Sequence, residues 1–231
     1  MMGLFESLDV MPSCSLAAGP EHMAQDELLL VAAADTHRPA FRSYRWAGNA
    51  VTFGYFQSLS RIEVSFPDHA LTRRWTGGGA VLHGDACEFT YALAVPATCA
   101  FSKLPASESY LAIHEGITRS LQAVGVAARM ASREEASDTQ GLACFLNPVA
   151  GDVLLGETDV KVAGAAQRRT RNGLLIQGSI RSPHDIPTEL ETALAEALGT
   201  EQTTMPAASL DEIADLVEAK YGRTDWLARK P

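Results

Sequence analysis

The amino-acid sequence predicts an α+β fold in which helices flank a mostly antiparallel sheet. The first observation behind this fold class is that segments of alternating or β-branched residues are interleaved with segments of helical periodicity. The second is that the 231 residues contain no internal repeat, low-complexity tract or long linker. Because a chain of this length can bury a core without disulfides, we expect a single domain over 1–231.

A first helix is predicted over Glu21–Ala34, where acidic residues in the first turns precede apolar residues available for burial. Three strands of a half-buried sheet follow, at Phe41–Trp46, Val51–Tyr55 and Phe89–Val95. The first strand alternates polar and apolar residues, and the second is β-branched and aromatic. The third places large apolar residues on one face and Thr or Ala on the other.

A second long helix is predicted from Ser107, as its N-cap, to Gly125, because a residue without Cβ can close the last turn. It should pack on the sheet. Short strands are expected around Asp152–Leu155, Val160–Ala166 and Leu174–Ile180.

Two helices close the chain. The first covers Thr188–Leu198 and stops at Gly199. The second covers Leu210–Lys220 and opens with a capping box formed by Ser209 and Glu212.

The charge balance excludes several classes of function. Lys and Arg total 19 against 28 Asp and Glu, a formal net charge of −9, which argues against nonspecific binding to nucleic acid or to an anionic membrane. The N-terminal residues do not resemble a signal peptide, and the longest apolar run, Leu28–Ala34, is too short to span a bilayer. We therefore expect a cytoplasmic protein.

The cysteines show no pattern typical of a metal site or a disulfide framework. They form no C-x-x-C pair and no cluster with histidine, so we predict no metal. Cys14, Cys87 and Cys99 have no matching motif and are interpreted as structural. Cys144, beside Phe145 and after a polar stretch, is either an inert thiol or a nucleophile activated by a nearby cation.

A glycine-rich segment is the first candidate for chemistry. Gly77–Gly79 follow Arg73, Arg74 and Thr76 and precede Ala80 and His83. Consecutive glycines are favoured where the main chain lies against a ligand or where φ is positive. The segment is therefore either a loop whose N–H groups face an anion or an acyl chain, or a bulged hairpin. It matches neither a P-loop nor a dinucleotide-binding motif.

A lysine between two valines is the second candidate. Lys161 belongs to a strand of small residues, and its ammonium points either to solvent or into a pocket where it binds a carbonyl or phosphate oxygen. The arginines that follow, Arg168, Arg169 and Arg171, form either a solvated face or a surface for an acidic partner.

These segments together resemble the lipoate-protein ligase and octanoyltransferase family, which is related to biotin-protein ligases. The resemblance runs from the Met23–Glu27 helix through the R-R-x-T-G-G-G-A-V-x-H segment ending at His83 to the K-V-A-G-x-A-Q segment that starts at Lys161. It continues to Gln177-Gly178-Ser179-Ile180 and covers about residues 23 to 228. Two departures stand out: Gln177 replaces the more usual His, and Gly156–Asp159 replaces a shorter turn.

The resemblance implies a tunnel for an eight-carbon acyl chain. Cys144 and Lys161 are its implied catalytic residues. The implied substrate-binding residues are Arg73, Arg74, Thr76, Gly77, Gly78, Gly79, Ala80, His83, Gly164, Ala166, Gln177 and Gly178.

Two chemistries share this family scaffold, and the resemblance favours the cysteine-dependent one. An octanoyltransferase takes octanoate from acyl carrier protein through a cysteine thioester and passes it to a lysine of a lipoyl carrier domain, without a cofactor. A lipoate-protein ligase instead uses ATP and Mg²⁺ to form an acyl-adenylate. The Cys144-Phe145 pair before the Lys161 strand, and a length that leaves little room for a C-terminal accessory domain, favour the transferase. A non-catalytic lipoyl-domain-binding module is the third alternative.

Overall fold

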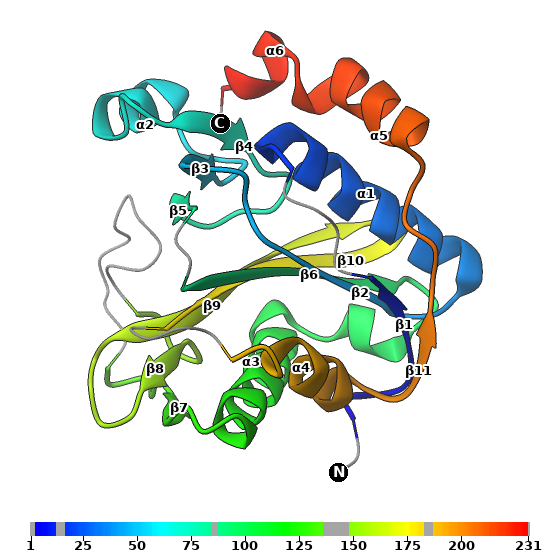
Figure 1. The fold of residues 1–231 in the computed structure, drawn as a ribbon, viewed down its shortest axis with the longest axis vertical. Helices are drawn as coiled ribbons and strands as arrows, with labels where there is room; N and C mark the ends of the chain where they lie inside the picture. The colour runs from blue at the N-terminus through cyan, green and yellow to red at the C-terminus, as the bar shows by residue number, and fades with distance from the viewer. Residues whose placement is uncertain (1–2, 13–16, 85–86, 136–147, 183–186, 231) are drawn as a thin grey trace.

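The computed structural model describes residues 3–12, 17–84, 87–135, 148–182 and 187–230. Over these ranges the chain forms one eight-stranded sheet and one three-stranded sheet, and helices cover both faces of the larger one (Figure 1). None of the helices in these ranges is long and apolar enough to cross a membrane.

The large sheet has the strand order β11-β1-β2-β6-β10-β9-β8-β7. Its strands are β1 (Phe5–Met11), β2 (Ala40–Tyr44), β6 (Glu88–Pro96), β7 (Ala128–Met130), β8 (Val153–Leu155), β9 (Lys161–Thr170), β10 (Gly173–Arg181) and β11 (Gly199–Thr204). β1 runs parallel to its neighbours β11 and β2, and the other neighbouring pairs are antiparallel. The prediction of a mostly antiparallel α+β fold is confirmed.

The small sheet positions the glycine-rich segment. Its strands are β3 (Ala50–Phe53), β4 (Ala70–Arg73) and β5 (Val81–His83). β3 lies in the centre, parallel to β4 and antiparallel to β5. Since β4 and β5 pair with β3 and not with each other, the bulged-hairpin alternative for Gly77–Gly79 is wrong. The segment is a crossing loop between two outer strands.

The helices are α1 (Gly19–Thr36), α2 (Leu59–Ser65), α3 (Ala106–Ala123), α4 (Leu190–Leu198), α5 (Leu210–Leu216) and α6 (Thr224–Leu227). A 3₁₀ turn covers Ala100–Lys103, and a π-helical turn covers Val217–Tyr221. The four predicted helices are present as α1, α3, α4 and α5. The sequence did not predict α2, α6 and the short strands β1, β4, β5, β7 and β11.

Helix boundaries depart from the prediction in small ways. α3 begins at Ala106 with Pro105 as its N-cap, and not with Ser107, because the extended backbone of Pro105 enters the helix directly. Gly125 has φ 82° and ends this helix as expected. Gly199 has φ −132°, so it starts β11 and is not a left-handed cap. The capping box of Ser209 and Glu212 is confirmed.

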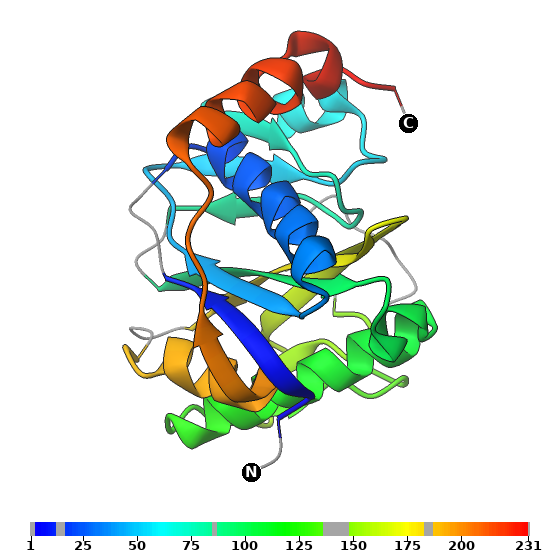
Figure 2. The same cartoon turned by 90° about the vertical axis from the view of Figure 1, so that its right-hand side faces the viewer.

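The central strands β2 and β6 of the large sheet are buried on both faces, so the expectation that they are half-buried is wrong. In β6, Phe89, Tyr91, Leu93 and Val95 pack in one core with residues of α3 and α4. Ala92 and Ala94 face the other way and pack against α1. Figure 2 shows α1 on one side of the sheet and α3 and α4 on the opposite side. The smaller side chains on the α1 face allow that helix a close approach.

Candidate active site

A narrow cavity of about 30 Å³ lies between α1, the small sheet and the central strands of the large sheet. It is lined by Met23, Tyr44, Trp46, Thr52, Arg74, Val81, His83, Thr90, Gly164, Ala165, Ala166, Gln177, Gly178 and Ser179. The mixture of apolar surface with a few polar groups in this lining is typical of a small-molecule site.

Arg74 shapes the glycine-rich loop from inside. Its Nη2 donates to the carbonyl oxygens of Gly77, at 2.9 Å, and Gly79, at 2.7 Å. Gly78, between them, has φ 82°, and a Cβ built there would lie 3.3 Å from the Cβ of Ala166. The loop therefore needs glycine at 78 for its backbone conformation, and it lies against β9 at the cavity.

Arg73 has a different role from its neighbour. Its guanidinium donates to backbone carbonyls of two separate segments, residues 54–57 and residues 227–229. The residue is fully buried and is not among those that line the cavity. Arg73 thus joins the loop after β3 to the C-terminal segment, and its hydrogen bonds are to main chain.

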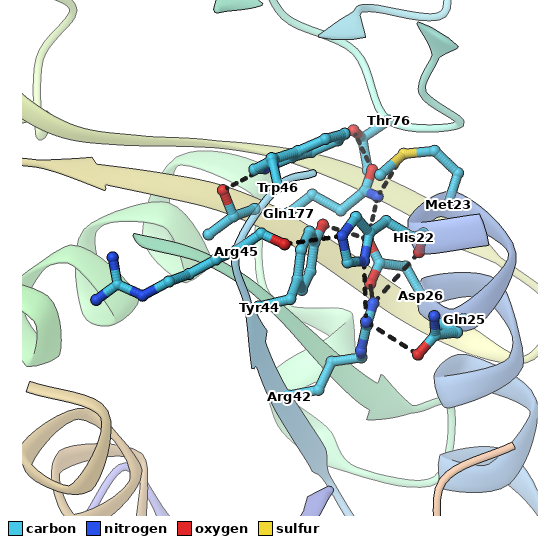
Figure 3. Close-up of polar contacts among 11 residues, drawn as sticks. His22, Met23, Gln25, Asp26, Arg42, Tyr44, Arg45, Trp46, Thr76 and Gln177 are labelled. Carbon is cyan, nitrogen blue, oxygen red and sulfur yellow. Dashed lines mark hydrogen bonds and ion pairs between the residues drawn. The ribbon is translucent and has the colours of Figure 1, made fainter. Parts of the chain in front are cut away.

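A buried ion pair anchors the other wall of the cavity (Figure 3). Asp26 of α1 pairs with Arg42 of β2, and both side chains are fully buried. The Tyr44 hydroxyl donates to the second Asp26 oxygen at 2.9 Å, and the amide of Gln177 donates to that oxygen at 2.5 Å. Burial raises the pKa of Asp26, whereas the Arg42 charge and these hydrogen bonds lower it. The carboxylate is therefore stabilised only by its complete set of partners.

Gln177 connects this ion pair to the glycine-rich loop. Because a carboxylate oxygen only accepts hydrogen bonds, the Gln177 nitrogen must face Asp26. Its Oε1 then faces the other way and accepts from the Thr76 hydroxyl at 2.7 Å (Figure 3). Thr76 is fully buried and stands directly before Gly77. The position of the loop is thus fixed from α1 through one side chain of β10.

His22 completes the network on its far side. Its Nε2 donates to the Arg45 carbonyl at 3.1 Å, which leaves Nδ1 to accept from Arg42 at 3.3 Å. Burial, and next the Arg42 charge, lowers the pKa of His22 to about 3. The ring is neutral at physiological pH and stacks on Tyr44 with centroids 4.1 Å apart.

A chain of hydrogen bonds lies at the small-sheet end of the cavity. Arg74 donates to the Thr52 hydroxyl at 2.8 Å, which lies 2.7 Å from His83 Nε2, and His83 Nδ1 lies 2.6 Å from the Glu88 carboxylate. The His83 ring stacks on Trp46 at 3.8 Å. Burial lowers the pKa of His83, and Glu88 opposes this. Both ring nitrogens have partners, so His83 is a fixed part of the wall.

Lys161 is buried, which decides the alternative left open by its sequence. Its ammonium lies 2.8 Å from Asp152, and the two side chains are 2% and 0% exposed. A Cβ built on Gly164 would lie 2.5 Å from Lys161 Cε and 2.7 Å from Nζ. The end of the Lys161 side chain therefore occupies the space where a Cβ of residue 164 would lie. This explains why a glycine stands three residues after the lysine on β9.

Neutral groups surround this lysine. The Tyr110 hydroxyl donates to Asp152, and its ring lies 3.9 Å from the His114 ring. Burial, and next the Lys161 charge, lowers the pKa of His114 to about 3. Burial raises the pKa of Tyr91, and the Asp152 charge adds to this. The buried cluster therefore concentrates its positive charge on Lys161 and its negative charge on Asp152.

β9 separates two hollows. It pairs with β8 only up to Ala163, and the residues after it have no strand partner on that side within the described ranges. A second, open hollow between the start of α3 and the loops near residues 131–133 and 149–151 is also lined by Ala165 and Ala166. Both residues line the cavity too, so the two hollows meet at this stretch of β9.

The structure brings most of the implied residues together. Arg74, His83, Gly164, Ala166, Gln177 and Gly178 line the cavity. Thr76, Gly78 and Lys161 each contact one of those residues. Gly77 and Gly79 hold Arg74 through their carbonyls. Ala80 instead packs in the core of the small sheet, and Arg73 binds main chain.

Sequence reasoning did not find the buried acidic residues that hold these side chains, Asp26, Glu88 and Asp152. Cys144 lies outside the described residues. Among the residues that are described, no group of three or more His, Cys, Asp or Glu is arranged to hold a metal ion.

Comparisons with known proteins agree on one family. A family model described as the lipoyl protein ligase A/B catalytic domain matches residues 19–220. An octanoyltransferase LipM of Carboxydothermus hydrogenoformans is 34% identical over 182 residues, 75% of this chain and 64% of the relative. One of Symbiobacterium thermophilum is 31% identical over 269 residues, 92% and 95% of the two chains.

The chain thus spans somewhat less than two thirds of the first relative and almost all of the second. A crystal structure of lipoate-protein ligase A bound with ATP has a TM-score of 0.73, with 99% of each chain covered and 18% identity. At this identity the likeness concerns the fold alone.

Proposed function

The chain belongs to the lipoyl protein ligase A/B catalytic domain family, and from this premise we propose that it is an acyltransferase of protein lipoylation. It moves an octanoyl group from acyl carrier protein to a lysine of a lipoyl carrier domain. Its relatives named octanoyltransferase support the reaction class. The observation that carries the proposal is the buried Lys161 ammonium, which lies against Gly164, a residue of the cavity wall.

The first step makes a thioester on the enzyme. The thiolate of Cys144 attacks the carbonyl carbon of the octanoyl thioester, a new carbon–sulfur bond forms, and the bond to the donor sulfur breaks. The donor thiol leaves with a proton. This role of Cys144 rests on its sequence position before the Lys161 strand and on the relatives' names.

The second step transfers the acyl group to the carrier domain. The uncharged amine of the carrier lysine attacks the same carbonyl carbon, an amide bond forms, and Cys144 leaves as thiolate while the amine releases a proton. The donor thioester is already activated, so the route consumes neither ATP nor Mg²⁺. A thiol nucleophile needs a reducing environment, and the cysteines of this chain show no disulfide pattern. We therefore propose that the protein is located in the cytoplasm.

Lys161 supplies the charge that both steps need. An ammonium held in a site with little water stabilises a thiolate and the oxyanion of each tetrahedral intermediate. Asp152 and Tyr110 hold it in one place, so little reorganisation is required when the oxyanion forms. The His114 and Tyr91 side chains in this cluster are uncharged, so they add no charge that competes with the Lys161 ammonium.

The cavity suits the acyl chain. Each methylene that leaves water there contributes about 0.8 kcal/mol to binding. Met23, Trp46, Val81 and the alanines of β9 supply apolar surface, and the glycine-rich loop closes over it. The carbonyl then lies towards Gly164, beside Lys161, and the donor and acceptor approach from the free edge of β9.

Intact-protein mass spectrometry tests this mechanism. The protein is mixed with octanoyl-acyl carrier protein in the absence of ATP, and wild type is compared with Cys144→Ala. We expect an octanoyl adduct on wild type and none on this variant, while Cys99→Ala, which removes a free cysteine of the described chain, keeps the adduct.

Other outcomes of that experiment identify the alternatives. An adduct on Cys144→Ala would assign the nucleophile elsewhere. No adduct on wild type, together with modification of a lipoyl domain by lipoate, ATP and Mg²⁺, would make the protein a ligase. No modification under either condition would favour a module that binds the lipoyl domain without turnover.

A further inference from the structure

Two arginines meet at the ring of Tyr55, beyond the part of β9 that lines the cavity. Arg168 lies on β9 two residues beyond Ala166, and its guanidinium carbon is 4.7 Å from the centroid of the Tyr55 ring. Arg229, in the C-terminal segment, approaches the same ring to 4.5 Å. Within the described ranges, no ion pair involves either side chain.

The fold holds both guanidiniums in place. Arg73 donates to the carbonyl oxygens of Tyr55 and Arg229, each at 2.8 Å, and so fixes the ring and the second arginine relative to each other. Trp75 contributes a further ring, 5.5 Å from Arg168. Such cation–π contacts orient a guanidinium without using its N–H donors. The Arg168 Nε is buried and has no hydrogen-bond partner.

The electrostatic setting is positive although the chain carries a net charge of −9. Burial, and next the Arg229 charge, lowers the pKa of Arg73. Burial also lowers the pKa of Lys220; its ion pair with Glu27 opposes this, and the Arg168 charge lowers the pKa further. Several like charges gathered in this way destabilise one another unless an anion joins them.

The neighbouring arginines do not share this environment. Arg169 points to the opposite face of β9 and donates to the Ser102 carbonyl and, at 3.0 Å, to the Ser109 hydroxyl. Arg171 is exposed in the turn after β9. The sequence grouped Arg168, Arg169 and Arg171 together, whereas the structure places only Arg168 against the Tyr55 and Trp75 rings.

We propose that Arg168 and Arg229 bind the phosphate group of the acyl donor, the phosphodiester that joins the thioester-bearing arm to its carrier protein. This inference rests on the proposed transferase function. If the acyl chain fills the cavity, its thioester lies near Gly164, four residues of extended strand or about 13 Å from Arg168. A pantetheine arm spans that distance, and its one charged group is the phosphate.

The chemistry of the two arginines fits this ligand. A guanidinium offers a planar pair of N–H donors that matches two phosphate oxygens, and two such groups surround one diester. The rest of the arm is uncharged and amphipathic, and the rings of Tyr55 and Trp75 lie beside its path.

Two donors with the same acyl thioester separate the phosphate from the rest of the substrate. Octanoyl-acyl carrier protein carries the phosphodiester, and octanoyl-N-acetylcysteamine carries the thioester without it. Transfer to a lipoyl domain is measured for Arg168→Gln, Arg229→Gln and the double variant. Arg171→Gln is the matched control, since it removes a nearby exposed arginine.

We expect each single variant to raise KM for the carrier-protein donor about tenfold, with kcat little changed, and the double variant to raise it further. The kcat/KM for the phosphate-free donor stays within about twofold of wild type, which also shows that the variants are folded. Arg168→Lys, which keeps the charge but loses the planar fork, should fall between Arg168→Gln and wild type.

Other results overturn the inference. An equal loss with both donors would mean that the arginines act on the acyl site or the fold. A rise in KM for the lipoyl domain alone would assign them to the acceptor. A loss confined to an ATP-dependent reaction of free octanoate would assign them to a nucleotide phosphate. If wild type uses neither thioester, the proposed function itself fails.

Discussion

Replacing Gly164 by alanine tests whether the position of the Lys161 ammonium controls the reaction. A Cβ built on Gly164 lies 2.5 Å from Lys161 Cε, 2.7 Å from Nζ and 3.3 Å from an Asp152 oxygen. Carbon atoms in contact normally lie about 3.5 to 4 Å apart, so the end of the lysine must move by about 1 Å. The ammonium then leaves its site beside Asp152.

The backbone tolerates the change, whereas the buried ion pair of Lys161 and Asp152 does not. The end of a lysine is flexible, and the φ of Gly164 lies outside the left-handed region, so the backbone accepts alanine. A catalytic group displaced by about 1 Å typically loses about a hundredfold in rate. We therefore expect kcat for octanoyl transfer, measured well below the Tm of the variant, to fall about a hundredfold in Gly164→Ala. We also expect a lower Tm, because Asp152 loses its buried partner.

The assay is octanoyl transfer to a lipoyl domain followed by mass spectrometry, with thermal unfolding measured in parallel. Gly116→Ala is the control, because a Cβ there, in the middle of α3, contacts nothing closer than an Arg119 nitrogen at 4.0 Å. That change should leave kcat unaltered and add roughly 0.5 to 1 kcal/mol of stability. Gly164→Ala turning over at the wild-type rate would refute the role given to Lys161.

Three further predictions concern pH, the loop and a helix end. Below pH 6.5 His114 is protonated in the unfolded chain, whereas in the folded chain its pKa of about 3 keeps it neutral. As the pH is lowered, this one residue therefore reduces the free energy of unfolding by about 1.4 kcal/mol per pH unit. Urea unfolding at pH 5 to 7 should show that slope reduced in His114→Phe and kept in His37→Asn, where the histidine is exposed. Gln177→Leu leaves the Thr76 hydroxyl without its acceptor and should raise KM for the donor severalfold. Gln177→His can both donate and accept and should retain most activity. Equal kinetics of the two variants would contradict the role of this hydrogen-bond network. Ser209→Ala removes the cap of α5 and should cost about 1 kcal/mol in urea unfolding, without a change in transfer rate.

The sequence predicted those elements whose own periodicity is strong. The long helices α1 and α3 and the central strands β6 and β10 were found because their apolar residues repeat over many positions. β4 and β5 have only four and three residues, and they become strands because β3 lies between them. The half-buried interpretation of β6 failed because Ala92 and Ala94 are small enough to be buried under α1.

Site residues were predictable where the local sequence is unusual. They were not predictable where a residue far away in the chain determines the role of a side chain. Three glycines and a lysine among small residues are unusual in any context, so Gly77–Gly79 and Lys161 could be identified from their letters. Asp26 and Asp152 look like ordinary surface acids in the sequence. Asp26 and Asp152 are fully buried because they form ion pairs with Arg42 of β2 and Lys161 of β9. No local sequence pattern encodes these two ion pairs.

The segment from Lys161 to Arg168 shows why the remaining small residues are needed. Gly164 leaves room for Lys161, while Ala166 faces Gly78 across the cavity, at a distance that a larger side chain would close. Arg168 continues the Ala166 row to the rings at the outer end. In the proposed mechanism, this one strand therefore carries the charge beside the reacting carbonyl, the wall along the acyl chain and the cation that binds the phosphate of the donor. A bulky residue at 164 or 166 should abolish acyl binding even if both cations stay in place.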